Sequence, residues 1–517
     1  MSFAYALLAL NLLATRQVPP GTQLHIRLLT PIGSYASRAG DPVRAVLIAP
    51  VLANGQVILP EGSLLAGSLK RVQRVGLGFI HENAALDLEF TSIAPPDGAS
   101  LALSSRVQEV DTGRERVTRD GSIRGVRTTS SLSYRTGGYI RTALQWEIHA
   151  EIAVWAIKAL VVQVPEPELY YPAGVELTLG LTRPVTITEA ATEPGTGGGL
   201  SAEERANMAV LVADLPNRTH TSATNRPSDL INLMFIGSRE QLETAFETAG
   251  WTRPETAGLR ANIRRIRAVA EGHGDMAAPM SDLLVQDLKA EMSWQKGFND
   301  ISKRHHIRIW KQPATWDGRE VWIGAATRDI DFAYFRPGRT MTHKIGEDVD
   351  QERDKVVNDL VFTSCAKTID NPERAEVPGF TRNATGDPMR TDTRLAVVRL
   401  TGCEKLPDFV ASEAAPSDLE PAQFGAAEMG STQPADPALA RHGRGVQRFF
   451  RREILCFRSD LLRENLYWRS YEGIRWMITA ARNRRIHTDD PTPAYPSTYE
   501  LGQSTTSRSR IVRDMLQ

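Results

Sequence analysis

The sequence predicts a multidomain protein with an N-terminal all-β domain, a small antiparallel barrel or sandwich, followed by an α+β domain and a helical tail. Short stretches of alternating apolar and polar residues fill most of the first hundred positions and predict antiparallel strands. From residue 230 a continuous apolar run is followed by a helical pattern, which favours a mixed sheet covered by helices. Near the C-terminus, arginine and aromatic residues at helical spacing predict the helices of the tail.

Composition bounds the class of protein. A chain of 517 residues is long enough for roughly two to four domains. Its 61 basic and 61 acidic residues give no net charge, so we expect no nucleic-acid partner. Three widely spaced cysteines, Cys365, Cys403 and Cys456, match no metal-ligand pattern and allow at most one disulfide. We expect them to be buried or unpaired thiols.

Residues 1–17 are expected to be a signal peptide or a membrane anchor. The apolar run FAYALLALNLLA has about the length of the hydrophobic region of a signal peptide and is too short to span a bilayer comfortably. No Lys or Arg precedes it, and a buried helix is the alternative. We therefore expect an exported protein, periplasmic or envelope-associated.

Residues 18–190 are expected to form one β-rich domain. Leu24, Ile26 and Leu28 alternate with polar residues, and Asn54-Gly55 is a strong hairpin signal. A proline-glycine turn, an alternating strand and a closing proline occur near residue 20 and again near residue 172, as in two strands of one barrel. Residues 104–138 are rich in Ser, Thr, Gly and Arg, so we expect a mobile loop there.

Three motifs in this region carry a resemblance to a known family: the turn GDPV at 40–43, the hairpin at Asn54-Gly55 and the segment PEGSL at 60–64. On these residues, the region 18–95 resembles the β-barrel of TrbI-type conjugal-transfer channel proteins. The resemblance implies a scaffold or assembly module of the cell envelope and supplies no catalytic residues.

Residues 191–228 are expected to be a linker around a short helix at 202–211, and residues 229–403 an α+β domain. LINLMFI at 230–236 predicts a strand buried on both faces. Ser238 and Gln241 form a capping box that begins a helix, and Gly250 stands where such a helix would end.

Four segments of this domain are similar to a second family: INLMFIGSREQLETAFETAGW, HHIRIW, WDGREVWIGAATRDI and THKIGEDVDQERDKVVNDL. Together they resemble the LssY C-terminal domain over about residues 229–365. The family is named after a protein from a secretion locus, so the resemblance implies an envelope context. It supplies no established catalytic residue.

Charged groups enter apolar segments between residues 304 and 360, where they are rare unless paired or functional. A two-residue turn at Asp317-Gly318 would place residue i opposite residue 635 − i, so His306 would face Asp329. Pro313 interrupts the first arm, so a slip by one residue or a bulge is the alternative register. A histidine beside a carboxylate is suited to catalysis, and it is equally what a buried histidine requires.

The next block predicts a helix capped by Asp348 or Asp350, with an apolar stripe that includes Val349, Val356 and Leu360. The candidate catalytic residues are His306, Asp329, His343, Asp350 and Asp354. His343, His306 and Asp350 or Asp354 offer ligands suited to a divalent metal such as zinc, manganese or iron, although no contiguous metal motif is present. Structural salt bridges and caps are the alternative, and the cofactor stays open.

Arg308, Arg328 and Arg353 are candidate anion-binding residues, because guanidinium groups match phosphate and carboxylate geometry. In the expected register Arg308 and Arg328 lie on opposite faces of the hairpin, so a single three-arginine pocket is not expected.

After the α+β domain we expect a linker at 404–440, basic amphipathic helices at 441–488 and a disordered tail at 489–517. The helices would dock on the α+β domain or on a membrane surface.

Two functional hypotheses follow. The first is an envelope-associated, non-enzymatic module that binds or scaffolds, with an envelope protein or a membrane surface as partner. The second is a hydrolase, metal-dependent or not, that acts on a phosphoester or an envelope lipid through the candidate catalytic residues. The oligomeric state stays open. If these residues converge on an open pocket the second hypothesis is favoured, and if each is held in a separate ion pair the first is favoured.

Overall fold

A computed structural model describes residues 16–53, 56–76, 83–96, 98–127, 167–187, 200–255, 268, 280–335 and 340–403. All of them belong to one compact unit, Met1–Cys456. The expected signal peptide (except for its last two residues), the linker at 404–440, the basic helices and the disordered tail lie outside the described residues. Within the described part of the chain, no helix has the length and apolar character needed to cross a membrane.

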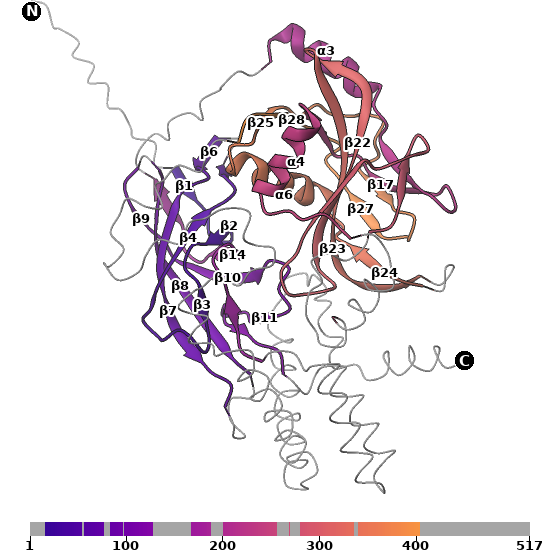
Figure 1. Ribbon diagram of the computed structural model, residues 1–517. Helices are drawn as coiled ribbons and strands as arrows, with labels where there is room; N and C mark the ends of the chain where they lie inside the picture. The colour runs from indigo at the N-terminus through magenta and orange to yellow at the C-terminus, as the bar shows by residue number, and fades with distance from the viewer. Residues whose placement is uncertain are drawn as a thin grey trace, which may run out of the picture. The chain divides into compact units, whose positions relative to one another are not determined.

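The first part of the chain, which we call the β domain (described residues 16–187), is a nine-stranded antiparallel sheet with the strand order β10-β14-β2-β4-β7-β8-β12-β11, and with β9 paired to β8 (Figure 1). The sheet curls into a near-closed barrel, since β10 at one end contacts β8 and β11 from the other. The strands are β2 (Gln23–Leu28), β4 (Pro42–Leu47), β7 (Leu64–Gln73), β8 (Ala85–Ala94), β9 (Leu101–Ala102), β10 (Ser105–Val110), β11 (Arg116–Val117), β12 (Ile123–Arg124) and β14 (Glu176–Leu181).

Three short strand pairs flank this barrel. The pair β5–β6 places Ala53 opposite Gln56, as the hairpin predicted at Asn54-Gly55 requires. The pairs are β1 (Arg16–Val18) with β15 (Val185–Ile187), β3 (Ile32–Gly33) with β13 (Tyr170–Tyr171), and β5 (Val51–Ala53) with β6 (Gln56–Leu59).

Alternation in the sequence explains the barrel interior. Leu24, Ile26 and Leu28 are completely buried, whereas Gln23 before them and His25 between Leu24 and Ile26 are exposed. The two repeated proline-glycine segments are neighbours, because β2 and β14 pair antiparallel. Both strands follow a glycine with positive φ (88° at residue 21, 94° at residue 174), a conformation that glycine adopts without strain.

The expected loop at 104–138 is wrong over its described part. β10, β11 and β12 lie there, and β10 forms the edge of the barrel beside β14. These strands are short and polar on their outer side, so their composition resembles that of a loop. Residues 128–138 lie outside the described residues.

The α+β domain (described residues 200–403) is built on a seven-stranded mixed sheet with the order β21-β22-β23-β18-β28-β25, and with β24 paired to β23. All four residues of β18 are buried, since β23 pairs with it on one side and β28, in parallel, on the other. The predicted strand with two buried faces is therefore confirmed. The strands are β18 (Leu233–Ile236), β21 (Met292–Lys296), β22 (Arg304–Trp316), β23 (Arg319–Phe335), β24 (Thr340–Ile345), β25 (Ala366–Asp370) and β28 (Ala396–Leu400).

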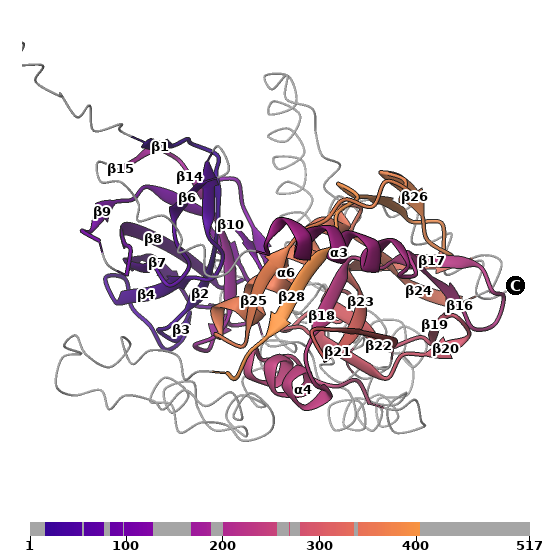
Figure 2. The same ribbon diagram turned by 90° about the horizontal axis from the view of Figure 1, so that it is seen from above.

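Two layers cover the faces of this sheet (Figure 2). On one face α4 (Arg239–Thr248) and α6 (Val349–Phe362) bury Phe246, Val356 and Leu360 against Phe235 and its neighbours. On the other face α3 (Ala202–Ala213) packs with strands of a small four-stranded sheet. The remaining strands are β16 (Arg218–Thr221), β17 (Pro227–Leu230), β19 (Leu283–Val285), β20 (Leu288–Lys289) and the hairpin β26 (Phe380–Arg382) with β27 (Pro388–Arg390).

Local signals placed these helices well. The capping box of Ser238 and Gln241 begins α4, and Gly250 follows its C-cap with a positive φ of 80°. Asp348 caps α6 and accepts hydrogen bonds from the amides of Asp350 and Gln351. The region 200–228 of the expected linker holds regular structure, namely the predicted helix, now α3, together with β16 and the start of β17.

The expectation of unpaired thiols is wrong for two of the three cysteines. A disulfide joins Cys365, which follows α6, to Cys403 at the end of the described region. Their separation of 38 residues in sequence hid this pairing, because β25 and β28 are brought together only by the sheet. Cys456 lies outside the described residues.

Candidate functional site

The β22–β23 hairpin places the predicted site, with a correction to its register. Asp317 and Gly318 have positive φ (49° and 69°), and Trp316 pairs with Arg319, as expected for a two-residue turn. An irregularity between residues 311 and 315, around Pro313, then shifts the pairing by two residues. His306 therefore lies opposite Thr327, and Arg304 opposite Asp329, so the expected His306–Asp329 register is wrong.

A shift of two residues keeps each side chain on its face of the sheet. His306 consequently still reaches Asp329 diagonally, with 2.9 Å between Nε2 and Oδ1. Arg304 Nε donates to the other oxygen, Oδ2, at 2.7 Å. His343 on β24 approaches the same oxygen, with Nδ1 at 3.4 Å. Three of the five candidate catalytic residues thus lie together, because His306 and His343 both approach the carboxylate of Asp329.

Burial and charge fix the ionisation of this group. Burial raises the pKa of Asp329, but the adjacent His306, His343 and Arg304 outweigh it and hold that pKa well below its usual range. Burial lowers the pKa of His343 to about 4, against the opposing charge of Asp329. At neutral pH the structure therefore contains an ionised, 3% exposed carboxylate beside a neutral imidazole that is 24% exposed.

The other two candidate residues belong to a separate network on α6. Arg353 donates to Asp392 at 2.7 Å, to Asp354 at 2.9 Å and to Asp350 at 3.2 Å. Asp350 also accepts from the hydroxyl of Thr391 at 2.8 Å. No hydrogen bond or ion pair among the described residues joins this network to Asp329. Asp350 and Asp354 thus stabilise a helix and the loop beside it.

The three candidate anion-binding arginines do not converge. Arg308 contacts Ser281 at 3.0 Å and Asp229 at 3.5 Å, whereas Arg353 belongs to the network on α6. Arg328 binds Glu109 at 2.6 Å on the opposite face of the hairpin from Arg308, as expected. Nor do the described residues contain a group of three His, Cys, Asp or Glu side chains that could hold a metal ion.

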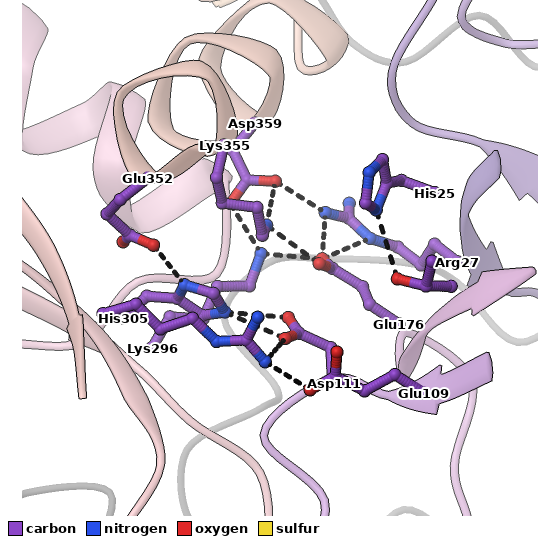
Figure 3. Close-up of polar contacts among 12 residues, drawn as sticks. His25, Arg27, Glu109, Asp111, Glu176, Lys296, His305, Glu352, Lys355 and Asp359 are labelled. Atoms are coloured by element: carbon purple, nitrogen blue, oxygen red, sulfur yellow. Dashed lines mark hydrogen bonds and ion pairs between the residues drawn. The ribbon is translucent and has the colours of Figure 1, made fainter. Parts of the chain in front are cut away.

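The largest group of ionisable side chains was not predicted, and it joins the β domain to the α+β domain (Figure 3). Glu176 on β14 and Asp359 on α6 share three cations. Asp359 accepts from Lys355 at 2.7 Å and from Lys296 at 2.9 Å, and Glu176 accepts from Arg27 at 2.7 Å. We call the whole group the interdomain cluster; it consists of Arg27, Glu109, Asp111, Glu176, Lys296, His305, Arg328, Glu352, Lys355 and Asp359.

His305 lies in the part of the cluster nearest to β22. Its Nδ1 is 2.6 Å from Glu352 of α6, and its Nε2 is 2.9 Å from Asp111, which follows β10 of the β domain. Burial lowers the pKa of His305, but Asp111 and Glu352 outweigh it and raise that pKa to about 9. The same interaction, with Arg328, holds the pKa of Asp111 well below its usual range in spite of burial.

Alternation along β22 places His305 on the opposite face from His306, together with Ile307. The lysine and aspartate at 355 and 359 also stand one helical turn apart. Their partners Arg27, Asp111 and Glu176 belong to the β domain and are far away in sequence, so no local pattern indicated the cluster.

Further contacts extend this interface beyond charge. The amide of Asp300 donates to the carbonyl of Thr112 at 3.2 Å, and Asn299 hydrogen-bonds Glu115 at 2.7 Å. Phe298 packs against the core of the β domain, with its ring centroid 5.8 Å from that of Tyr171. Apolar, backbone and ionic contacts therefore hold the two domains together.

Comparison with known proteins finds a family that is similar to the second domain. Residues 212–395 match the family model described as LssY C-terminus, so the resemblance expected over 229–365 is confirmed and its range is wider at both ends. Among solved structures the chain is similar to ComB10 of the Com type IV secretion system of Helicobacter pylori, with 15% sequence identity and a TM-score of 0.20. That match covers 34% of this chain and 93% of ComB10. No curated protein matches the chain.

Proposed function

We propose that this chain is an exported, envelope-associated module that binds or scaffolds a partner and catalyses no reaction. The observation that carries the proposal is the distribution of the five candidate catalytic residues. Asp350 and Asp354 are held by Arg353, and Asp329 is held by Arg304 and His306, so the carboxylates are occupied in two separate networks. Side chains that are satisfied in this way stabilise a fold, whereas an active site requires convergent groups around an accessible position.

Three features support the envelope location. The disulfide between Cys365 and Cys403 is typical of an oxidising compartment. The apolar run at residues 3–14 has the length of the hydrophobic part of a signal peptide. The matching family is named after a protein of a secretion locus, as set out above.

A scaffold needs domains that keep a fixed orientation, and the interface supports this role. The interdomain cluster spans both domains, and the Phe298 side chain reaches the core of the β domain. Both domains would then present their outer surfaces as one body to an envelope protein or a membrane surface.

A hydrolase acting on a phosphoester or an envelope lipid is the second candidate function. The observation that favours it is Asp329 between two histidines, with His343 neutral and partly exposed. A neutral imidazole oriented by a carboxylate is suited to act as a general base.

Fractionation, metal analysis and a hydrolysis assay on the full-length chain distinguish the two functions. The proposed function predicts that the chain is found in the envelope fraction and that Cys365 is alkylated only after reductant is added. It also predicts that the purified protein contains no bound metal and does not cleave a generic phosphodiester. Cleavage that is lost in His343→Gln but kept in the exposed control Asp354→Asn would establish the hydrolase instead. A reduced, cytoplasmic chain would remove the envelope location.

A further inference from the structure

The two ring nitrogens of His305 both face carboxylates, and this geometry constrains the protonation of the ring. Nδ1 is 2.6 Å from Glu352 and Nε2 is 2.9 Å from Asp111. A neutral imidazole has one N–H and can donate to one of them, whereas an imidazolium donates to both. Either neutral tautomer would turn a nitrogen lone pair toward a carboxylate at hydrogen-bonding distance.

The carboxylates have few other donors at this position. Among the described residues, no group forms a hydrogen bond with the buried Glu352 Oε1, so the hydrogen bond from His305 to Oε2 contributes much of the stabilisation of that carboxylate. Asp111 also accepts from Arg328 at 3.1 Å. Since Glu352 belongs to the α+β domain and Asp111 to the β domain, the imidazolium bridges the two domains.

The count of charges in the whole cluster also favours the proton. Its fixed cations are four: Arg27, Lys296, Arg328 and Lys355. Its carboxylates are five: Glu109, Asp111, Glu176, Glu352 and Asp359. A protonated His305 makes the count five against five, whereas a neutral ring leaves one negative charge in excess, part of which solvent screens because Glu109 is 41% exposed.

We propose that His305 is a proton-dependent latch that fastens the β domain to the α+β domain while its imidazole is charged. The charged groups that face the ring come from every element packed against it: Asp111 after β10, Glu352 and Lys355 on α6, Lys296 on β21 and Arg328 on β23. The indole of Trp251 lies 6.4 Å from the imidazole and carries no charge. The proposal goes beyond the proposed function and does not depend on it.

The direction of the pH dependence follows from the raised pKa of about 9. The stabilisation that the charged His305 gives to the interface is fully present below pH 6.5, the ordinary pKa of histidine, and is lost as pH rises through about 9. With these two pKa values, a rise from pH 7 to 9.5 lowers the equilibrium constant for association of the two domains by roughly 60-fold. Lys296 acts in the opposite direction, because burial lowers its pKa, so an alkaline loss does not originate from that lysine.

Hydrogen exchange of the full-length protein tests the latch. The amide of Asp300 reports on the interface, because it donates to Thr112 across the two domains, and the amide of Leu28 reports on the β domain alone through its bond to Val175. After correction for intrinsic exchange, the protection of the Asp300 amide should fall by roughly 60-fold between pH 7 and 9.5. The protection of the Leu28 amide should change little.

Matched variants assign the effect. His305→Gln should lack this pH dependence, whereas His220→Gln, a histidine of the four-stranded sheet, should keep it. Where His305→Gln does not fold, Asp111→Asn takes its place and should move the fall in protection to lower pH. A wild-type Asp300 amide with constant protection would overturn the latch. The latch would also be overturned if the protection of the Asp300 amide fell as much in His305→Gln as in the wild type. The same holds if the pH at which this protection falls were unchanged in Asp111→Asn.

Discussion

Replacing Asp359 by asparagine removes one charge from the centre of the interdomain cluster while keeping the size of the side chain. Asp359 is completely buried and has four partners: Lys355 at 2.7 Å, Lys296 and the Trp251 indole at 2.9 Å, and Arg27 at 3.5 Å. In Asp359→Asn the three cations would face Glu176 alone. The amide of the asparagine would also bring two new donors toward groups that are themselves donors.

The cost of this change can be bounded. Removing one partner from a buried ion pair typically costs about 3–5 kcal/mol, because the remaining charges lose their compensation in a poorly solvated environment. Asp354→Asn on the same helix is the matched control, since Asp354 is 59% exposed and its one ion-pair partner among the described residues is Arg353. Exposed ion pairs contribute about 0–1 kcal/mol, so the control should change stability little.

Urea unfolding of the full-length protein and of both variants measures the two free energies side by side. The reasoning requires a much larger loss in Asp359→Asn than in Asp354→Asn. Equal losses, both below about 1 kcal/mol, would refute it, because the cluster would then contribute no more than a surface ion pair.

Three further predictions concern the folding of the chain. A fragment of residues 18–190 should melt cooperatively, whereas residues 18–100 should not, because β14 pairs with both β2 and β10; equal thermal stability of the two fragments would contradict this. Cys403→Ser should cost about 2–4 kcal/mol in urea unfolding, and added reductant should have no further effect on this variant. Acid should destabilise the protein below about pH 4.5, because burial raises the pKa values of Glu176 and Asp359 but the cations of the cluster outweigh it and lower them. The stabilisation by these carboxylates is present above their pKa in the unfolded chain and is lost as pH falls below it. A free energy of unfolding that stays constant from pH 5 to 2 would contradict this assignment.

Local physics explains which elements could be predicted from sequence. Leu24, Ile26 and Leu28 reveal their strand by alternation, and Ser238 with Gln241 reveals a helix start by side-chain capping. These signals act within a few residues, so they hold without knowledge of the tertiary structure.

The rest depended on contacts between distant segments. The two-residue shift around Pro313 changed the partner of His306 while keeping its face, which no turn rule specifies. β18 and β28 pair in parallel although they are far apart in sequence, and the antiparallel pairing of β25 with β28 brings Cys403 to Cys365.

The candidate site could be predicted only in part, because it too depends on contacts between distant segments. The contact between His306 and Asp329 survives because the shift preserved side-chain alternation. Asp350 instead accepts from Arg353 and from Thr391, and Thr391 lies too far along the chain for a local pattern to indicate this contact. Strand alternation suffices to place His305 on the face opposite to His306, but its bridging role requires Asp111 of the other domain.

Unfolding of His306→Ala and Asp329→Asn, measured together with metal content, tests most directly the central claim that these groups serve structure rather than chemistry. The claim predicts a loss of about 1–3 kcal/mol for His306→Ala, the usual cost of leaving a buried partner unsatisfied. It predicts about 3–5 kcal/mol for Asp329→Asn, which removes the buried carboxylate that Arg304 and His306 share, and no metal in the parent protein. Unchanged or improved stability in both variants, with loss of a bound metal, would contradict it, because active sites often sacrifice stability for function.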